Sequence, residues 1–275
     1  MRDRLDTTSA AASDPHTVGA LHEALQRRLL DRRDEIAANP ILANGGRLLN
    51  ILDPDECGWE EVRREAERDR FLALTVMPRE ATLARIADLF GAELEPPYWQ
   101  ALFGPADDVL SACAALLAAA PLPDGWTVVS DRSPGHSVIG EVQSLNAATG
   151  VAPSPAWYMR GEAVPHLTTC IRDATGTLVA SGAATDRYHP ASPLDGTVFA
   201  GSVSVAPDHR RRGLGVFVCA RLLTDSHDAF GWRHVLAQAK ADNAASCGML
   251  RRCGLIPDPD LVTIMINLSG GYVTR

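Results

Sequence analysis

The feature that most constrains the fold is a strand, a basic loop and a helix that follow one another within residues 198–230. A β-rich run at residues 198–205 is stopped by Pro207, which has no amide hydrogen for a strand ladder. Arginines and glycines come next, and the apolar periodicity then predicts a helix over residues 215–230. Other short β-rich runs alternate with helical patterns after residue 125, which indicates a mixed α/β or α+β domain.

The loop between this strand and this helix has the properties of an anion site. The first amides of a helix have no partner within it, and the helix dipole adds partial positive charge there. Gly213 and Gly215 let a bulky anion approach the main chain. Three consecutive arginines raise the local potential: Arg210, Arg211 and Arg212. The sequence carries neither the Rossmann glycine fingerprint nor the P-loop pattern at this loop.

A second motif follows one helix and one strand later. The run at residues 235–239 leads into Asn243-x-x-Ser246-x-x-Met249-Leu250, with Gly254-Leu255 after three further residues. The first motif reads Val205-x-Pro207-x-x-Arg210-x-x-Gly213-x-Gly215. In this order and separation, the two motifs resemble the signatures of the Gcn5-related N-acetyltransferases. The resemblance covers roughly residues 125–270 and leaves residues 1–124 outside it.

The resemblance implies a fold and an activity for residues 125–275. The fold would be α+β (mixed α/β), with a central mixed, mostly antiparallel sheet flanked by helices. The activity would be transfer of an acetyl group from acetyl-CoA, a co-substrate, to a primary amine of a small molecule or peptide by direct attack. No metal is implied.

The resemblance also implies which residues hold coenzyme A. The loop would bind the pyrophosphate, and the pantetheine arm would lie in a gap between strands 198–205 and 235–239, pairing with the main chain as an added strand does. The expected coenzyme-binding residues are Val203, Val205, Arg210, Arg211, Arg212, Gly213, Leu214, Gly215, Val216, Asn243 and Ser246.

The catalytic groups are where this sequence departs from the family pattern. The position of the usual general-acid tyrosine is Leu250, and a strand position that often carries a base glutamate is Ser202. Ser202 could hold a water but cannot act alone as a base. Other polar residues on segments that line the acceptor side in the family are candidates for proton transfer. The catalytic candidates are Ser202, Glu162, His166 and Tyr158.

Residues 1–124 are expected to form a mainly helical N-terminal region of unknown role. Helices are predicted over residues 60–74, 79–90 and 107–120, and the Pro- and Gly-containing segment 121–125 is read as a linker. A degenerate second copy of the acetyltransferase fold is the less favoured alternative, because no second R-x-x-G-x-G/A pattern occurs in residues 1–124.

Charge and cysteine content set the expected surroundings. The net charge of −8 argues against nucleic-acid or anionic-membrane partners. The acidic surplus lies in residues 1–124, so the C-terminal half is the likelier host of an anionic ligand. The six cysteines form no C-x-x-C pair, and with no apolar leader or spanning segment we expect a cytoplasmic protein with reduced thiols. A homodimer stays open. So does a non-catalytic acyl-CoA sensor with a helical partner-binding domain.

Overall fold

The computed structural model describes residues 19–269, and its elements include ten strands. The strands are β1 (Leu42–Asn44), β2 (Leu49–Ile51), β3 (Phe71–Pro78), β4 (Tyr98–Pro105), β5 (Thr127–Asp131), β6 (His166–Arg172), β7 (Leu178–Thr185), β8 (Thr197–Val205), β9 (His234–Ala239) and β10 (Ile256–Asn267). The helices are α1 (Gly19–Asp31), α2 (Arg33–Ala37), α3 (Pro54–Cys57), α4 (Trp59–Asp69), α5 (Arg79–Phe90), α6 (Ala106–Ala119), α7 (His136–Thr149), α8 (Ala156–Met159), α9 (Leu214–Phe230) and α10 (Ala244–Arg252).

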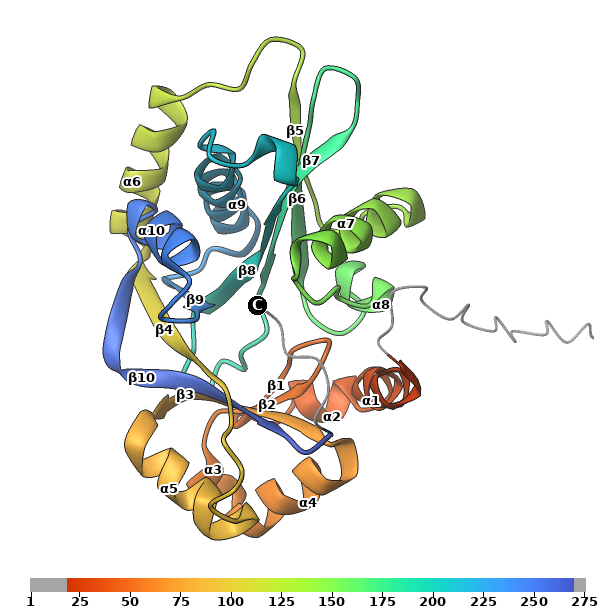
Figure 1. Cartoon of the computed structure of the whole chain (residues 1–275), viewed down its shortest axis with the longest axis vertical. Coiled ribbons are helices and arrows are strands. Elements are labelled where there is room, and N and C mark those ends of the chain that lie inside the picture. Colours follow the sequence, from red (N-terminus) through yellow and green to blue (C-terminus); the bar gives the residue numbers. More distant parts are fainter. Residues whose placement is uncertain (1–18, 270–275) are drawn as a thin grey trace, which may run out of the picture.

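All ten strands belong to one sheet, in the order β1-β2-β3-β10-β4-β9-β8-β7-β6-β5. The pairs β2–β3 and β8–β9 are parallel, and the other pairs are antiparallel. The sheet is therefore mixed and mostly antiparallel, as the resemblance implies for residues 125–275. In Figure 1, α7 and α8 lie on one side of strands β5–β8, and α6, α9 and α10 lie on the other.

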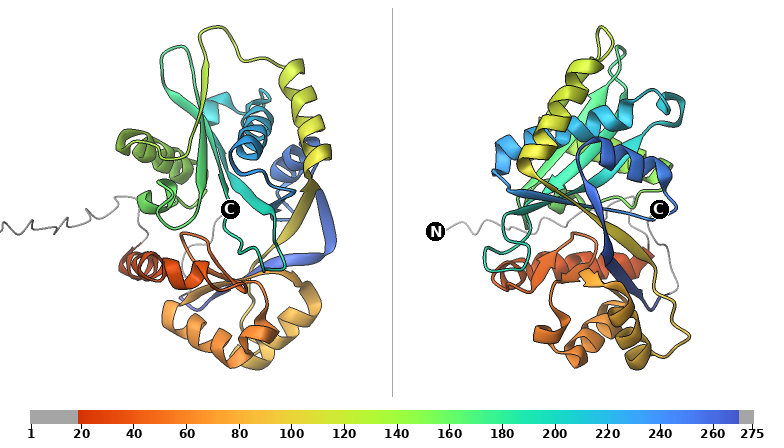
Figure 2. Two further views of the ribbon diagram at one scale, coloured as in Figure 1. Left: turned by 180° about the vertical axis from the view of Figure 1, so that it is seen from behind. Right: turned by 90° about the vertical axis from the view of Figure 1, so that its left-hand side faces the viewer.

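Residues 19–124 are mainly helical, as expected, but the structure does not set them apart from the rest of the chain at residue 125. Residues 19–124 also supply four strands, and β10 from the end of the chain pairs with both β3 and β4. Helix α6 packs against α9, with Val109 and Cys113 buried in the same apolar cluster as Leu222 and Leu223. The two halves therefore share one sheet and one core, and β4 and β10 are the long strands that join the upper and lower parts in Figure 2.

The predicted helix over residues 60–74 is wrong in its last turn. Helix α4 ends at Asp69, Arg70 takes a left-handed conformation with φ of 63°, and β3 begins at Phe71. The apolar run from Phe71 to Leu74 is buried throughout because β2 and β10 flank it and α4 packs over it. A short, continuously apolar segment of this kind cannot be assigned to helix or strand from periodicity alone.

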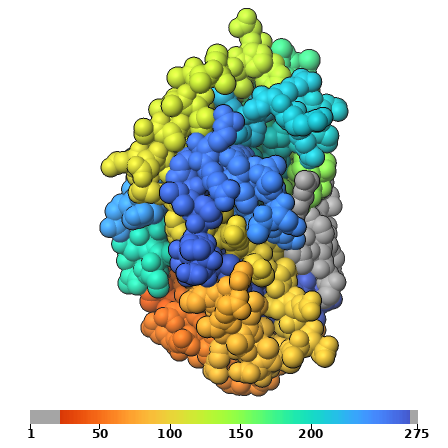
Figure 3. All heavy atoms as spheres, turned by 60° about the vertical axis from the view of Figure 1, so that its left-hand side comes forward, coloured from red at the N-terminus to blue at the C-terminus, as the bar shows by residue number. Residues whose placement is uncertain are grey.

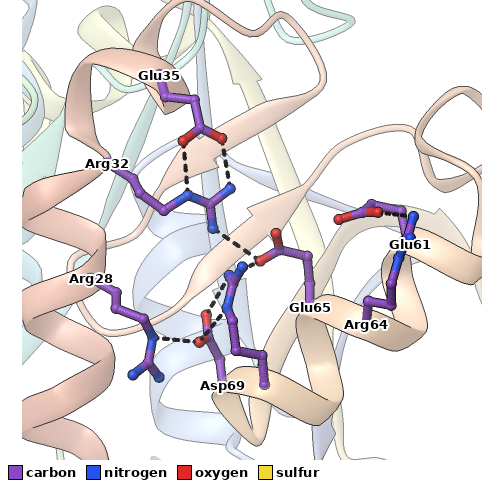
Figure 4. Close-up of polar contacts among 8 residues, drawn as sticks. Arg28, Arg32, Glu35, Glu61, Arg64, Glu65 and Asp69 are labelled. Carbon is purple, nitrogen blue, oxygen red and sulfur yellow. Dashed lines mark hydrogen bonds and ion pairs between the residues drawn. The ribbon is translucent and has the colours of Figure 1, made fainter.

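The N-terminal helices cover their side of the sheet as one layer held by apolar contacts and ion pairs. Leu25 and Leu29 of α1 are buried with Val62 of α4 and Ile86 of α5 against strands β3 and β10. Between α1, α2 and α4, arginines alternate with carboxylates (Figure 4): Arg28 pairs with the buried Asp69, and Arg32 pairs with Glu35 and Glu65. The carboxylates of Asp69, Glu35 and Glu65 are thus paired with arginines within the layer.

Two further observations concern the outside of the molecule. Figure 3 shows α10 at the surface between α6 and the layer of α4 and α5. Within residues 19–269, no helix has both the length and the apolar character needed to cross a lipid bilayer.

Candidate active site

Strands β8 and β9 start as neighbours and then part. They pair only at Thr197–His234, Val198–Val235 and Phe199–Leu236. Beyond Phe199, β8 keeps its antiparallel partner β7 on one edge, while β9 pairs with β4. The other edge of β8, from Ala200 to Val205, therefore faces a gap without a partner strand. The predicted parting of these two strands is present.

A bulge in β8 lies beside this gap. The register with β7 shifts between Ser181 and Ala183, opposite the segment that contains Ser202. Ser202 has φ of 52°, a left-handed conformation that non-glycine residues rarely adopt. A bulge interrupts the ladder, and here the register gives Ser202 and Val203 no partner in β7.

The turn after β8 offers main-chain amides and no competing side chain. Within the described residues, the amides of residues 211–216 donate to no acceptor, and the first bond of α9 is Phe217 N to Gly213 O at 3.0 Å. No side chain caps α9, and Gly213 is left-handed with φ of 79°. The arginines of the turn are exposed, and Arg210 Nε donates to Val205 O at 3.1 Å, across the turn. The turn therefore presents several free donors and positive charge at one place.

The gap opens into a cavity of about 200 Å³. Its walls come from β8, β9 and α10 at one end and from α8, β6, β7 and the hairpin of β1 and β2 at the other. The lining includes Val203, Ser246, Met249 and Leu250 beside the gap. It also brings together three of the four predicted catalytic candidates: Ser202, His166 and Tyr158.

His166 and Tyr158 are buried at the end of the cavity away from the turn. Tyr158 Oη donates to Asn44 O at 3.0 Å, and its ring packs edge-on against the His166 ring. His166 Nε2 lies 3.0 Å from Thr168 Oγ1, while Nδ1 has no hydrogen-bond partner in the described chain. Burial lowers the pKa of His166 to about 4, so its imidazole is neutral at pH 7.

Sequence comparison identifies the domain that carries this geometry. Residues 143–255 match the model of the Acetyltransferase (GNAT) family. These residues form a GNAT domain. The matched range contains the parted strands, the turn and α10, so the predicted membership of the C-terminal half is confirmed. No curated protein matches the sequence.

Solved structures share the fold of the chain at low sequence identity. A GCN5-related N-acetyltransferase from Kribbella flavida is 16% identical, with 94% of this chain and 100% of that chain covered and a TM-score of 0.56. A tandem GNAT protein from the clavulanic acid biosynthesis pathway is 14% identical, with coverages of 83% and 77% and a TM-score of 0.52. A GCN5-related N-acetyltransferase from Sphaerobacter thermophilus is 14% identical, with coverages of 83% and 75% and a TM-score of 0.50.

Two predicted site residues of the GNAT domain have other partners. Glu162 does not line the cavity, and its carboxylate pairs with Arg160 Nε at 2.6 Å on the surface. Asn243 Oδ1 accepts from Ser246 N at 3.1 Å and so caps α10. Leu250, at the usual tyrosine position, is 5% exposed and belongs to the apolar core. The side chain at this position therefore supplies no proton donor to the gap.

The sequence prediction missed polar residues that line the cavity and come from both the GNAT domain and the N-terminal half. Arg187 and Thr185 line the cavity, as do Arg47 and Asn50 from the β1–β2 hairpin. None of these residues belongs to a motif, and the hairpin reaches the cavity only because both halves share one sheet. A signal was available for Arg187, since it lies in the loop that follows β7 and functional residues often lie on such loops.

Proposed function

We propose that this chain transfers an acyl group, acetyl as the default, from acyl-coenzyme A to a primary amine. One observation carries the proposal: the partnerless edge of β8 lies beside a cavity and ends in a turn with free amides. An extended, thioester-bearing ligand with an anionic end matches such a site, since the amides take the anion and the strand edge takes the amide groups of the arm.

The coenzyme would be held by main-chain groups more than by side chains. The pyrophosphate sits on the amides of residues 211–216, with Arg210, Arg211 and Arg212 raising the local potential. Gly213 and Gly215 leave room, because a Cβ at Gly213 would meet nothing within 4 Å. The pantetheine arm pairs with β8 near Val203 and Val205, and Asn243, by capping α10, keeps Ser246 at the gap.

The chemistry needs one proton to move from the amine to the sulfur. The amine nitrogen attacks the thioester carbonyl, the carbonyl oxygen becomes an oxyanion beside the main chain at the Ser202 bulge, and the C–S bond then breaks as the amide forms. His166, neutral and with Nδ1 unpartnered, takes the proton from the nitrogen and returns it to the departing thiolate. Ser202 and Tyr158 shape the cavity around these atoms.

Only the C-terminal half would bind coenzyme A. One structural neighbour is a tandem GNAT protein, and β3–α5–β4–α6 repeats the strand–helix–strand–helix order of β8–α9–β9–α10. Val76 in β3 is even left-handed with φ of 63°, as Ser202 is in β8. However, β10 lies between β3 and β4 and pairs with both, so no gap remains there, and α5 starts directly after β3 without a glycine turn.

Calorimetry with acetyl-CoA, followed by chromatographic detection of free coenzyme A in the presence of an amine panel, tests the proposal. We expect one acetyl-CoA per chain and amine-dependent release of coenzyme A. Binding without release on any amine would favour the alternative of a non-catalytic acyl-CoA sensor, which the apolar Leu250 supports. Absence of binding at high protein concentration would refute both functions.

A further inference from the structure

The acceptor end of the cavity is cationic. Among the described residues, its lining contains Arg47 and Arg187 but no aspartate and no glutamate. Arg187 lies with its guanidinium carbon 3.9 Å from the centre of the Phe199 ring, and Nη2 donates to Tyr188 Oη at 3.1 Å. These contacts position the guanidinium group without neutralising it. None of the ion pairs within the described chain includes Arg187.

Arg187 is also short of hydrogen-bond partners. Its Nε is enclosed and donates to no acceptor in the described chain. Thr185 Oγ1 and His166 Nδ1 are also buried without a hydrogen-bond partner in the described chain. The β6–β7 register places His166 directly opposite Thr185. A guanidinium group stays charged at any physiological pH, so removing it from water costs free energy unless an anion compensates it.

The hairpin from the N-terminal half closes this end. Gly46 lies flat on the Tyr158 ring, since a Cβ there would come within 2.6 Å of it. Arg47 Nη1 donates to Ala152 O at 2.5 Å, and Arg47 lines the same cavity as Arg187. A Cβ on Gly45 would lie 3.6 Å from Arg187 Nη1, so the tip of the guanidinium group reaches the hairpin. This end belongs to a cavity of about 200 Å³, which suits a small molecule better than a peptide chain.

This cationic end is separate from the coenzyme turn. Arg187 contacts Phe199 near the start of β8, and the turn begins after Val205 at its other end. Six residues of extended strand span about 20 Å. The Ser202 bulge lies between the two ends, where an acyl group held from one side would meet an amine held from the other.

We propose that the acceptor carries a carboxylate as well as the reacting amine, and that Arg187 binds this carboxylate. The acceptor class is then a free amino acid or a similarly small amino carboxylic acid. This inference rests on the proposed function. It makes Arg187 a specificity-determining residue, with Thr185 and Arg47 beside it in the same wall.

The test compares acceptors that differ only in the carboxylate. Free amino acids and the corresponding amino acid amides are assayed as pairs with wild-type protein and acetyl-CoA, at equal concentrations of the free-base amine. We expect kcat/KM to favour the acid by about 10- to 100-fold, the range of a charge-assisted hydrogen bond. The preference should lie mainly in KM, since the carboxylate is bound in the ground state as well.

Variants separate recognition from structure. Arg187→Gln should bring the acid-to-amide ratio towards one and leave the affinity for acetyl-CoA unchanged, and Arg187→Lys should restore part of the preference. Arg172→Gln is the matched control, because Arg172 lies on β6 outside the cavity and pairs with Glu141. Should Arg187→Gln not fold, the lysine variant and the wild-type comparison still decide.

The outcomes distinguish the two proposals. Failure of wild-type protein to bind acetyl-CoA would refute the proposed function. Acetyl-CoA binding and acetylation with equal rates on acids and amides would overturn the carboxylate inference alone, as would an acid preference that persists in Arg187→Gln. If no acceptor of the panel is acetylated, calorimetry of the same acids with the coenzyme A complex decides, and absence of binding overturns the inference.

Discussion

The two ends of α9 provide a matched test of the coenzyme turn. Gly213 precedes the helix and Gly231 follows it, and both are exposed, left-handed glycines with φ of 79° and 64°. A Cβ at either position would meet nothing within 4 Å, so neither substitution causes a clash. Glutamate at each position carries the same backbone strain, about 1–2 kcal/mol, and adds the same charge. Only Gly213 lies where the diphosphate is proposed to bind.

The expected magnitudes follow from charge and position. A carboxylate about 4 Å from one phosphate charge is repelled by about 1 kcal/mol in bulk water and about 4 kcal/mol near a protein surface. We therefore expect Gly213→Glu to weaken acetyl-CoA binding by about 2 kcal/mol or more, about 30-fold. Gly231→Glu should bind as wild type does. It should also be the less stable of the two, because its charge is at the negative end of the helix dipole.

Calorimetry of both variants at one ionic strength measures the affinities, and urea unfolding measures the stabilities. The reasoning would be refuted if Gly213→Glu bound acetyl-CoA within about threefold of wild type. Equal loss of affinity in the two variants would refute it as well, since the loss would then follow from damage to α9.

Three further predictions concern stability, each measured by urea unfolding. Burial lowers the pKa of His166 from 6.5 to about 4, so between these pH values the unfolded chain binds a proton at this residue and the folded chain does not. From pH 7 to pH 5, the free energy of unfolding of wild type should therefore fall by about 2 kcal/mol more than that of His166→Gln. Equal losses would contradict this burial. Asp69→Asn should lower the free energy of unfolding by about 2 kcal/mol or more, since Arg28 and Arg68 lose their counter-charge. Glu67→Gln, at an exposed position, should change it little. Similar effects of the two variants would mean that the layer in Figure 4 does not depend on its buried carboxylate. Gly46→Ala should lower the free energy of unfolding more than Gly176→Ala, because both glycines are left-handed but only a Cβ at Gly46 would clash with the Tyr158 ring. An equal loss would show that the hairpin does not pack on that ring.

The C-terminal half is predictable because its motifs determine both local structure and spacing. Helix α9 begins one residue before its predicted start and ends where predicted. The parting of β8 and β9 follows from the resemblance, because the two motifs flank the strands that part. The sequence has leucine at the position of the usual general-acid tyrosine, and the structure places this Leu250 in the apolar core.

The N-terminal half is less predictable for a physical reason. The segment at Phe71 becomes a strand because β2 pairs with one edge of it and β10, almost two hundred residues later, pairs with the other, and no local pattern contains that information. The cationic wall has the same origin. Arg47 and Arg187 line one cavity because the β1–β2 hairpin and β7 belong to one sheet, and each alone looks like an ordinary loop arginine in the sequence.

Residue-resolved hydrogen exchange of the turn tests the central claim most directly. The amides of residues 211–216 have no acceptor in the described chain, so they should exchange rapidly in the free protein. Saturating coenzyme A should slow them markedly, together with the β8 amides that face the gap, while residues near Gly231 stay unchanged. Unchanged exchange at residues 211–216 in protein saturated with coenzyme A would contradict the proposed binding mode.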